Sequence, residues 1–427
     1  MKNFFLKYQN KIYFNLIFFI ISIIYLSYIV SSFDQIIGDK WAYNNLFINY
    51  STGLVRRGLL GEIFIIINEI SGIEPLKFFT SIFFIAYLLQ IYFFYKLLFN
   101  YKNFKVFITF FTLSPALMLF YIYDLNVFLS KDIFIVLAIL FHALTIHQNR
   151  SDEKYYKKFL YFIMIPILIL NSANHENQIF FIPFHCLLTL YFFSSKKNIK
   201  YDLKFLKPYI ILIIPIIILL TSSGSFEKLS ILNESISKYD AKIPNQFAGN
   251  FNLAIGGFIK WHFFYHGPKD FINLLFCFFL SLFLFYLIFD YMIKNNLLVI
   301  HKSLNNFYLI IISPAFLILL IMLDHGRSLH LLTIHLVAFF LTLRLNITKI
   351  KKTVLNIKKS FFTIRLLFIF LIFYLFFWYL PQGGGFTGIG NFSSLYKSSL
   401  INELLRLFLI IFNYVDAEII NLPRIYI

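Results

Sequence analysis

At 427 residues, with 59% hydrophobic and only 14% charged residues, the chain does not have the composition of a soluble protein, in which about a quarter of the residues are charged. The 59 phenylalanines and 28 tyrosines exceed what one globular core buries, so lipid must solvate much of the surface. A net charge of +18 also suggests nucleic acid as a partner, but the basic residues stand in short clusters between apolar segments. That pattern is typical of the cytoplasmic loops of membrane proteins, and we expect no nucleic-acid partner.

The first apolar segment covers residues 12–30 and is about as long as a bilayer is thick. No small-residue cleavage site follows it, which favours a retained span over a signal peptide. Lys2, Lys7 and Lys11 precede it, so the N-terminus is predicted to be cytoplasmic. The outer loop 31–75 follows, and within it we expect the apolar segment 54–70 to lie in the membrane interface as an amphipathic or re-entrant helix.

Further apolar segments predict the remaining spans. They cover residues 76–95, 106–122, 132–147, 159–171, 178–194, 208–222, 271–292, 307–323, 329–343 and 364–380, with a twelfth near 402–416. With this threading every cytoplasmic loop is basic, while most acids fall on the outer side, some of them in the long loop 223–270 between spans seven and eight. We therefore predict an all-α polytopic transmembrane helical bundle of about 11–12 spans, a single integral membrane domain over residues 1–427.

The first group of polar residues on the outer side contains Asp34 and Asp39, followed by the arginine pair Arg56 and Arg57. Arginine is scarce in this lysine-rich chain, and two arginines on the outer side run against the positive-inside tendency. A planar guanidinium binds phosphate oxygens through two parallel hydrogen bonds, which lysine cannot copy. Alternatively, the pair caps a surface helix and extends to lipid headgroups.

The second group is the run 171–178, NSANHENQ, between two apolar segments. Such a polar run at the mouth of a helical hairpin is costly unless it faces a cavity or pairs internally. Within it, His175 and Glu176 are candidates for acid–base chemistry or for one end of a metal site, and Asn174 for substrate binding. The alternative is a tight, hydrated turn between two spans.

The third group, Asp324, His325 and Arg327, again lies between two spans on the outer side. Arg327 is a further candidate for phosphate binding, with Asp324 orienting it or acting as a base. Alternatively, the two pair with each other across one helical turn. His330 and His335 lie further into the span, as ordinary polar residues of the bundle.

Three weaker groups are interpreted as structural. They are Asp124 with Lys131 and Asp132, then Trp261 with His262 and His266, and the glycine-rich turn 382–386.

Together these side chains suit the handling of a sugar linked to a lipid diphosphate. Arginines neutralise the diphosphate, and a carboxylate takes a proton from an acceptor hydroxyl as it attacks the anomeric carbon. The candidate catalytic residues are Asp34, Asp39, His175, Glu176 and Asp324, and the candidate substrate-binding residues are Arg56, Arg57, Arg327, His325 and Asn174. No cofactor is predicted, although the carboxylates are also compatible with a divalent metal.

The topology and the segments YSTGLVRRGLLGE, NHE and DHGR resemble the multi-spanning glycosyltransferases of the GT-C type and the Wzy-like polymerases of O-antigen or capsule. The resemblance implies a multi-pass protein of the bacterial inner (cytoplasmic) membrane, with membrane lipid and a polyprenyl-diphosphate-linked glycan as partners, that transfers repeat units outside the cytoplasm. Two alternatives remain open: a flippase or transporter for a lipid-linked sugar, and a membrane acyltransferase that modifies the same polymers with His175 as base.

Overall fold

The computed structural model is mostly helical and describes residues 2–31, 40–53, 57–102, 107–108, 111–112, 114, 116–123, 128–149, 152–197, 203–214, 217, 226–243, 278–282, 286, 292, 294, 298–299 and 325–345. The predicted spans 307–323, 364–380 and 402–416 lie outside these residues, as do most of 271–292 and parts of 106–122 and 208–222. The glycine-rich turn 382–386 and residues 261–266 also lie outside.

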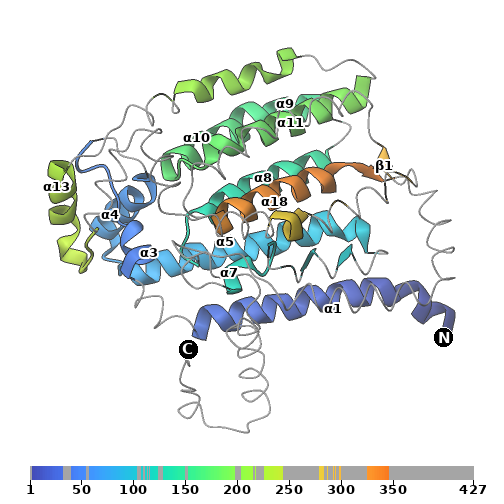
Figure 1. Cartoon of the computed structure of the whole chain (residues 1–427), viewed down its shortest axis with the longest axis horizontal. Helices are drawn as coiled ribbons and strands as arrows, with labels where there is room; N and C mark the ends of the chain where they lie inside the picture. Colours follow the sequence, from blue (N-terminus) through green and yellow to red (C-terminus); the bar gives the residue numbers. More distant parts are fainter. Residues whose placement is uncertain are drawn as a thin grey trace, which may run out of the picture.

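Figure 1 shows the helical elements of the described residues. In chain order they are α1 (Lys2–Ser31), α3 (Lys40–Asn45), α4 (Leu59–Ser71), α5 (Pro75–Leu98), η1 (Phe99–Tyr101), α7 (Phe120–Tyr123), α8 (Asp132–Gln148), α9 (Glu153–Phe159), η3 (Leu160–Met164), α10 (Ile165–Asn174), α11 (Gln178–Lys197), η4 (Leu203–Leu212), α13 (Phe226–Ile236), η5 (Ser237–Tyr239) and α18 (His325–Thr342). One short antiparallel pair joins β1 (Leu298–Val299) to β2 (Arg344–Leu345).

Three of the described helices are long and apolar enough to cross a membrane: Asn10–Ser27, Pro75–Tyr101 and Glu153–Asn174. Three shorter apolar helices, Asp132–Gln148, Gln178–Phe193 and Gly326–Thr342, coincide with further predicted spans. These features are those of a membrane protein. The predicted total of about 11–12 spans stays a prediction, because several of those segments lie outside the described residues.

The fifth predicted span, 159–171, has different limits in the structure. It belongs to one continuous helical stretch of 22 residues, Glu153–Asn174, which includes the π-helical turn η3. The stretch begins at Asp152, whose side chain accepts the backbone N–H of Tyr155 at 2.8 Å and so caps the helix. The lysines interpreted as a loop, Lys154, Lys157 and Lys158, therefore stand on the first turns of this helix.

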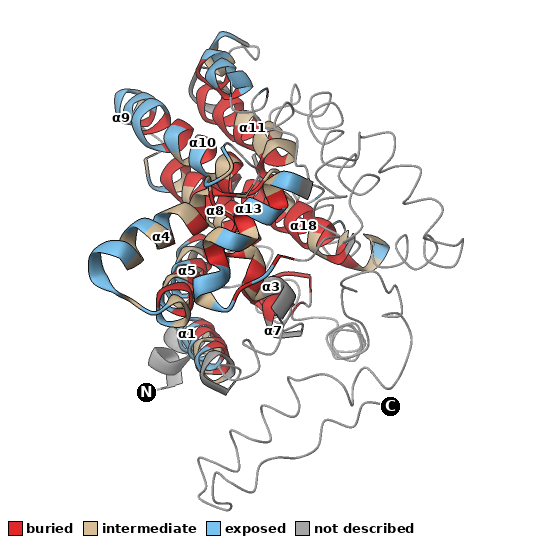
Figure 2. Ribbon diagram, turned by 90° about the vertical axis from the view of Figure 1, so that its left-hand side faces the viewer, coloured by how far each residue is buried: buried red, intermediate tan, exposed pale blue. Residues whose placement is uncertain are grey.

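The helix α8 is at the centre of the bundle. It packs against α5, α11 and α18 and is buried along most of its length (Figure 2). On α1, α5 and α9–α10, in contrast, large apolar side chains face outward, for example Phe19 on α1, Ile85 on α5 and Phe162 in η3. Apolar side chains on the outside of an apolar core are expected where lipid replaces water as solvent.

Within the bundle, a network of hydrogen-bonded polar side chains, which we call the polar network, joins α8, α9, α11 and η4. The hydroxyl of Tyr156 is 2.8 Å from both His142 Nε2 and Thr189 Oγ1, and Thr189 is 2.8 Å from the hydroxyl of Tyr209. At the end of the polar network, the hydroxyl of Tyr209 donates to the carbonyl of His185, whose ring lies against that of His142. Buried polar groups that are hydrogen-bonded in this way specify one arrangement of the helices.

Candidate functional site

Several helices begin or end at one end of the bundle, on the left in Figure 1. There α10 gives way to α11, and α5, α8 and α18 begin, with α4 close by, whereas the N-terminus of α1 is at the opposite end. Contacts between α10 and α4 bring the segment around Arg57 against the α10–α11 connection. This arrangement places side chains from four separate parts of the chain within reach of one another.

A close ion pair at this end joins Arg57 and Glu176. Nε of Arg57 donates to both carboxylate oxygens of Glu176, at 3.0 and 2.9 Å, and Nη2 donates to Oε1. Both side chains are largely buried, with exposed fractions of 17% and 19%. A charge-assisted contact that uses two guanidinium nitrogens is among the stronger hydrogen-bonded pairs in proteins.

The backbone of Arg57 is strained. Its φ of 67° lies in the left-handed region, which a residue with a side chain rarely adopts. The ammonium of Lys131 donates to the carbonyl of Arg57 at 2.6 Å and holds this conformation. Burial lowers the pKa of Lys131 to about 7, with the charge of Arg57 adding to the effect and that of Glu176 opposing it.

The glycines after Arg57 serve packing within the chain. A Cβ on Gly61 would collide with the backbone carbonyl of Ile48, and one on Gly58 would collide with the ring of Tyr50. The small residues therefore allow α4 to approach the preceding segment closely.

Asp132, the first residue of α8, accepts two hydrogen bonds and lies close to two further cationic or ionisable side chains. Ser130 Oγ donates to its Oδ2 at 2.8 Å, and Asn177 Nδ2 donates to Oδ1 at 3.3 Å. His175 Nε2 is 3.5 Å from Oδ1, and Arg327 Nε is 3.6 Å from Oδ2. With an exposed fraction of 2% for its side chain, Asp132 depends on these partners, because a buried carboxylate without them is strongly destabilising.

The orientation of His175 follows from its neighbours. The backbone N–H of Asn177 donates to Nδ1 at 3.2 Å, so the proton of the neutral ring is on Nε2, facing Asp132. Burial lowers the pKa of His175 to about 4, Asp132 and Glu176 oppose this, and Arg57 and Arg327 add to it. The imidazole is thus neutral, and its lone pair is already engaged by the backbone.

The same neighbours keep Glu176 ionised. Burial alone would raise its pKa, but the charge of Arg57, the proximity of His175 and the hydrogen bonds of Arg57 hold the pKa well below its usual range. Next to these groups, the side-chain oxygens of Asn174 and Asn177 are buried and accept no hydrogen bond from the described part of the chain.

The structure thus brings together four of the candidate residues, Arg57, His175, Glu176 and Arg327, with Asn174 beside them. His325 is the first residue of α18, and nothing is described of its side chain. Asp34, Asp39, Arg56 and Asp324 lie outside the described residues.

Lys131 and Asp132, interpreted from the sequence as structural, lie at the centre of this group. We refer to Arg57, Lys131, Asp132, His175, Glu176 and Arg327 as the charged cluster. A signal for the two residues was present in the sequence: a lysine and an aspartate stand at the start of a largely apolar helix, where ionisable residues are costly.

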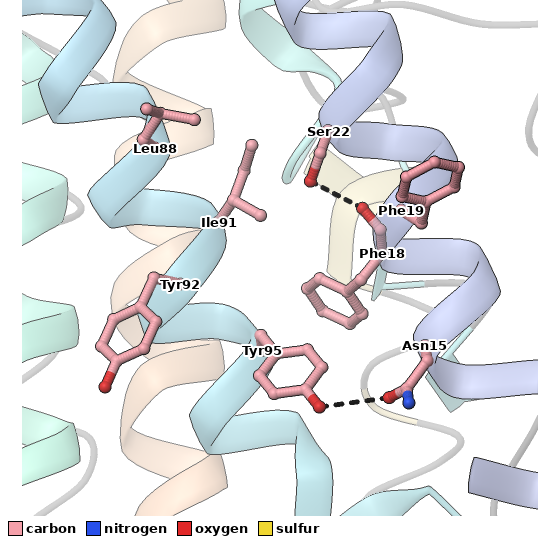
Figure 3. A pocket seen from close by; sticks show the side chains of 8 residues that line it. All are labelled: Asn15, Phe18, Phe19, Ser22, Leu88, Ile91, Tyr92 and Tyr95. Carbon is pink, nitrogen blue, oxygen red and sulfur yellow. Dashed lines mark hydrogen bonds between the residues drawn. The ribbon is translucent and has the colours of Figure 1, made fainter. Parts of the chain in front are cut away.

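Metal coordination and a surface groove are two further possibilities for a site. Among the described residues, no group of three or more His, Cys, Asp or Glu side chains has the geometry of a metal site. A groove of about 350 Å³ lies between α1 and α5 and is lined largely by Phe18, Phe19, Leu88, Ile91 and Tyr92 (Figure 3). Its polar contacts are local, such as the Tyr95 hydroxyl that donates to Asn15 at 3.1 Å, so it lacks the charges that the predicted chemistry needs.

Comparison of the chain with protein-family models, with curated proteins and with solved structures gave no match.

Proposed function

We propose that the chain is a membrane glycosyltransferase of the polymerase type. Its donor is a glycan linked to a polyprenyl diphosphate, and it acts on the extracytoplasmic face in the assembly of a surface polysaccharide such as O-antigen or capsule. The observation that carries the proposal is the convergence of Arg57 and Arg327, far apart in the sequence, on the Glu176 and Asp132 carboxylates at one end of an apolar bundle.

In the proposed reaction, the oxygen of an acceptor hydroxyl bonds to the anomeric carbon of the donor sugar. The bond from that carbon to the lipid diphosphate breaks, and the diphosphate leaves with the electron pair while Arg57 and Arg327 stabilise its charge. The hydroxyl proton passes to a carboxylate of the charged cluster, Glu176 or Asp132. The amide oxygens of Asn174 and Asn177, which accept no hydrogen bond from the residues that the structure describes, are suited to accept hydrogen bonds from sugar hydroxyls.

His175 has a positioning role in this scheme. Its Nδ1 accepts the backbone N–H of Asn177, and its Nε2–H faces Asp132, so no lone pair is available for a substrate proton. This geometry weighs against an acyltransferase that uses His175 as its base.

The proposal is tested by exchanging each arginine for lysine in cells that make the polymer. Arg57→Lys and Arg327→Lys keep the positive charge but lose the paired hydrogen bonds, and we expect a fall in chain elongation of about 100-fold or more. Gel analysis should then show single repeat units in place of long chains, at unchanged protein levels. The matched control is Lys77→Arg, an exposed cation at the start of α5 with a side-chain exposure of 69%. Normal polymer in both arginine variants would contradict the phosphate-binding role.

A flippase for the same lipid-linked glycan is the second candidate, and the polar network inside the bundle favours it. His142, His185 and Tyr156 are ionisable groups deep between helices, a feature common in transporters. The side on which substrate accumulates separates the two functions. A defective polymerase leaves single repeat units on the outer face of the membrane, whereas a defective flippase leaves them on the cytoplasmic face.

A further inference from the structure

The guanidinium of Arg57 is already occupied by an anion that belongs to the protein. The two oxygens of the Glu176 carboxylate accept from Nε and Nη2, the same two-point geometry with which arginine binds a phosphate. An incoming diphosphate therefore cannot use this side of Arg57 while Glu176 stays in place.

The two partners differ in how firmly they are held. Arg57 is fixed at its backbone, because Lys131 binds its carbonyl and is itself only 4% exposed. Glu176 stands in the short connection between α10 and α11. Within the described part of the chain, its carboxylate accepts hydrogen bonds from the side chain of Arg57, and Nδ1 of His175 lies 3.7 Å from Oε2. Its side chain is 19% exposed, so a displaced carboxylate has a route toward solvent.

Among the described residues, both arginines of the charged cluster lie against a carboxylate. Arg327 faces Asp132, and Arg57 faces Glu176, so each arginine has a carboxylate partner when no substrate is bound. A buried arginine without a partner would be destabilising, which explains why the protein fills the site itself. A diphosphate can enter only by taking over one of these partnerships.

We propose that Glu176 is an internal competitor for the diphosphate site, displaced from Arg57 when the lipid-linked donor binds; this inference rests on the proposed function. With such competition, the apparent affinity for diphosphate equals the intrinsic affinity multiplied by the fraction of molecules in which Arg57 is free. The competition also makes donor binding the event that frees the Glu176 carboxylate from Arg57.

The experiment measures binding of inorganic diphosphate to the purified full-length protein in lipid nanodiscs by isothermal titration calorimetry. Glu176→Gln removes the competing charge while its amide oxygen still accepts a hydrogen bond from Arg57, and we expect affinity to rise about tenfold or more. Glu176→Asp keeps the charge but shortens its reach, and a smaller rise is expected. Arg57→Lys should bind about tenfold more weakly. Glu74→Gln, an exposed carboxylate at the same end of the bundle, is the matched control and should bind like the wild type.

The outcomes separate the two proposals. Equal or weaker binding by both Glu176 variants, with a wild type that binds, would overturn the competition and leave the proposed donor class intact. An absence of diphosphate binding in the wild type and in both Glu176 variants would contradict the donor class, and the competition with it. A rise in affinity in Glu74→Gln equal to that in Glu176→Gln would show a general charge effect and would also overturn the inference.

Discussion

At the scale of single residues, the charged cluster depends on a small number of buried ionisable groups whose protonation is set by their neighbours. His175 is neutral and donates toward Asp132, while Glu176 is held ionised by Arg57. A left-handed backbone at Arg57 adds strain that the Lys131 hydrogen bond offsets. Strain of this kind, about 1–2 kcal/mol per residue, is retained where it places a functional group.

The pKa of His175 gives the first prediction. Burial lowers this pKa to about 4 from the ordinary 6.5. At pH values between 4 and 6.5, His175 therefore carries a proton in the unfolded chain but not in the folded protein. The stability contributed by the neutral ring is therefore complete above pH 6.5 and falls as the pH drops from 6.5 toward 4. Glu176, with a pKa held below its usual range, loses its contribution at still lower pH.

We expect the thermal unfolding midpoint of the detergent-solubilised protein to fall between pH 7 and pH 5, and to fall less in His175→Gln than in the wild type. His175→Gln retains an amide that can donate toward Asp132, so its folded state is preserved for the comparison. An identical pH dependence in the two proteins would show that His175 does not titrate between the folded and unfolded states as described.

At the scale of elements, the helices are joined by hydrogen bonds as well as by apolar contact. The hydroxyl of Tyr156, on α9, connects to His142 on α8 and to Thr189 on α11. We expect Tyr156→Phe to lower the free energy of unfolding by about 1–3 kcal/mol, because it leaves these buried partners unsatisfied. The adjacent Tyr155→Phe makes the same change at a position that is 46% exposed and should have no measurable effect. Equal thermal stability of the two variants would contradict the structural role of the network.

The elements were predictable from the sequence to different degrees. The long apolar runs with basic flanks closely predicted the bounds of α5, α8 and α11. The length of an apolar run determines whether it can cross the bilayer, so such runs are read directly from the sequence. The helix Glu153–Asn174 was predicted too short, since the lysines of its first turns look like a loop until Asp152 is seen to cap it. Around residues 54–70, the sequence predicted a helix in the interface, and α4 (Leu59–Ser71) covers most of that range.

At the scale of the whole molecule, the charged cluster could be predicted only in part. Arg57 and Arg327 stood out because arginine is scarce, and His175 and Glu176 because a polar run interrupts apolar sequence. Which loops meet, however, is decided by how α8 packs against its neighbours, and sequence spacing does not contain that information. Asp132 was therefore interpreted as structural, although its partners come from the α10–α11 connection and from α18.

The orientation of the bundle gives the last prediction. Basic residues at the ends of described helices, including Lys96, Lys102 and Lys154, lie at the end opposite the charged cluster, where the N-terminus of α1 also lies. From the positive-inside rule we predict that this end is cytoplasmic and that the charged cluster is outside. In a protein freed of its own thiols by Cys186→Ala and Cys277→Ala, Lys77→Cys should react with a membrane-impermeant maleimide in intact cells. Lys154→Cys should react only after the cells are permeabilised. The reverse pattern would place the cluster in the cytoplasm, where nucleotide-activated sugars are available, and would contradict a reaction on the extracytoplasmic face.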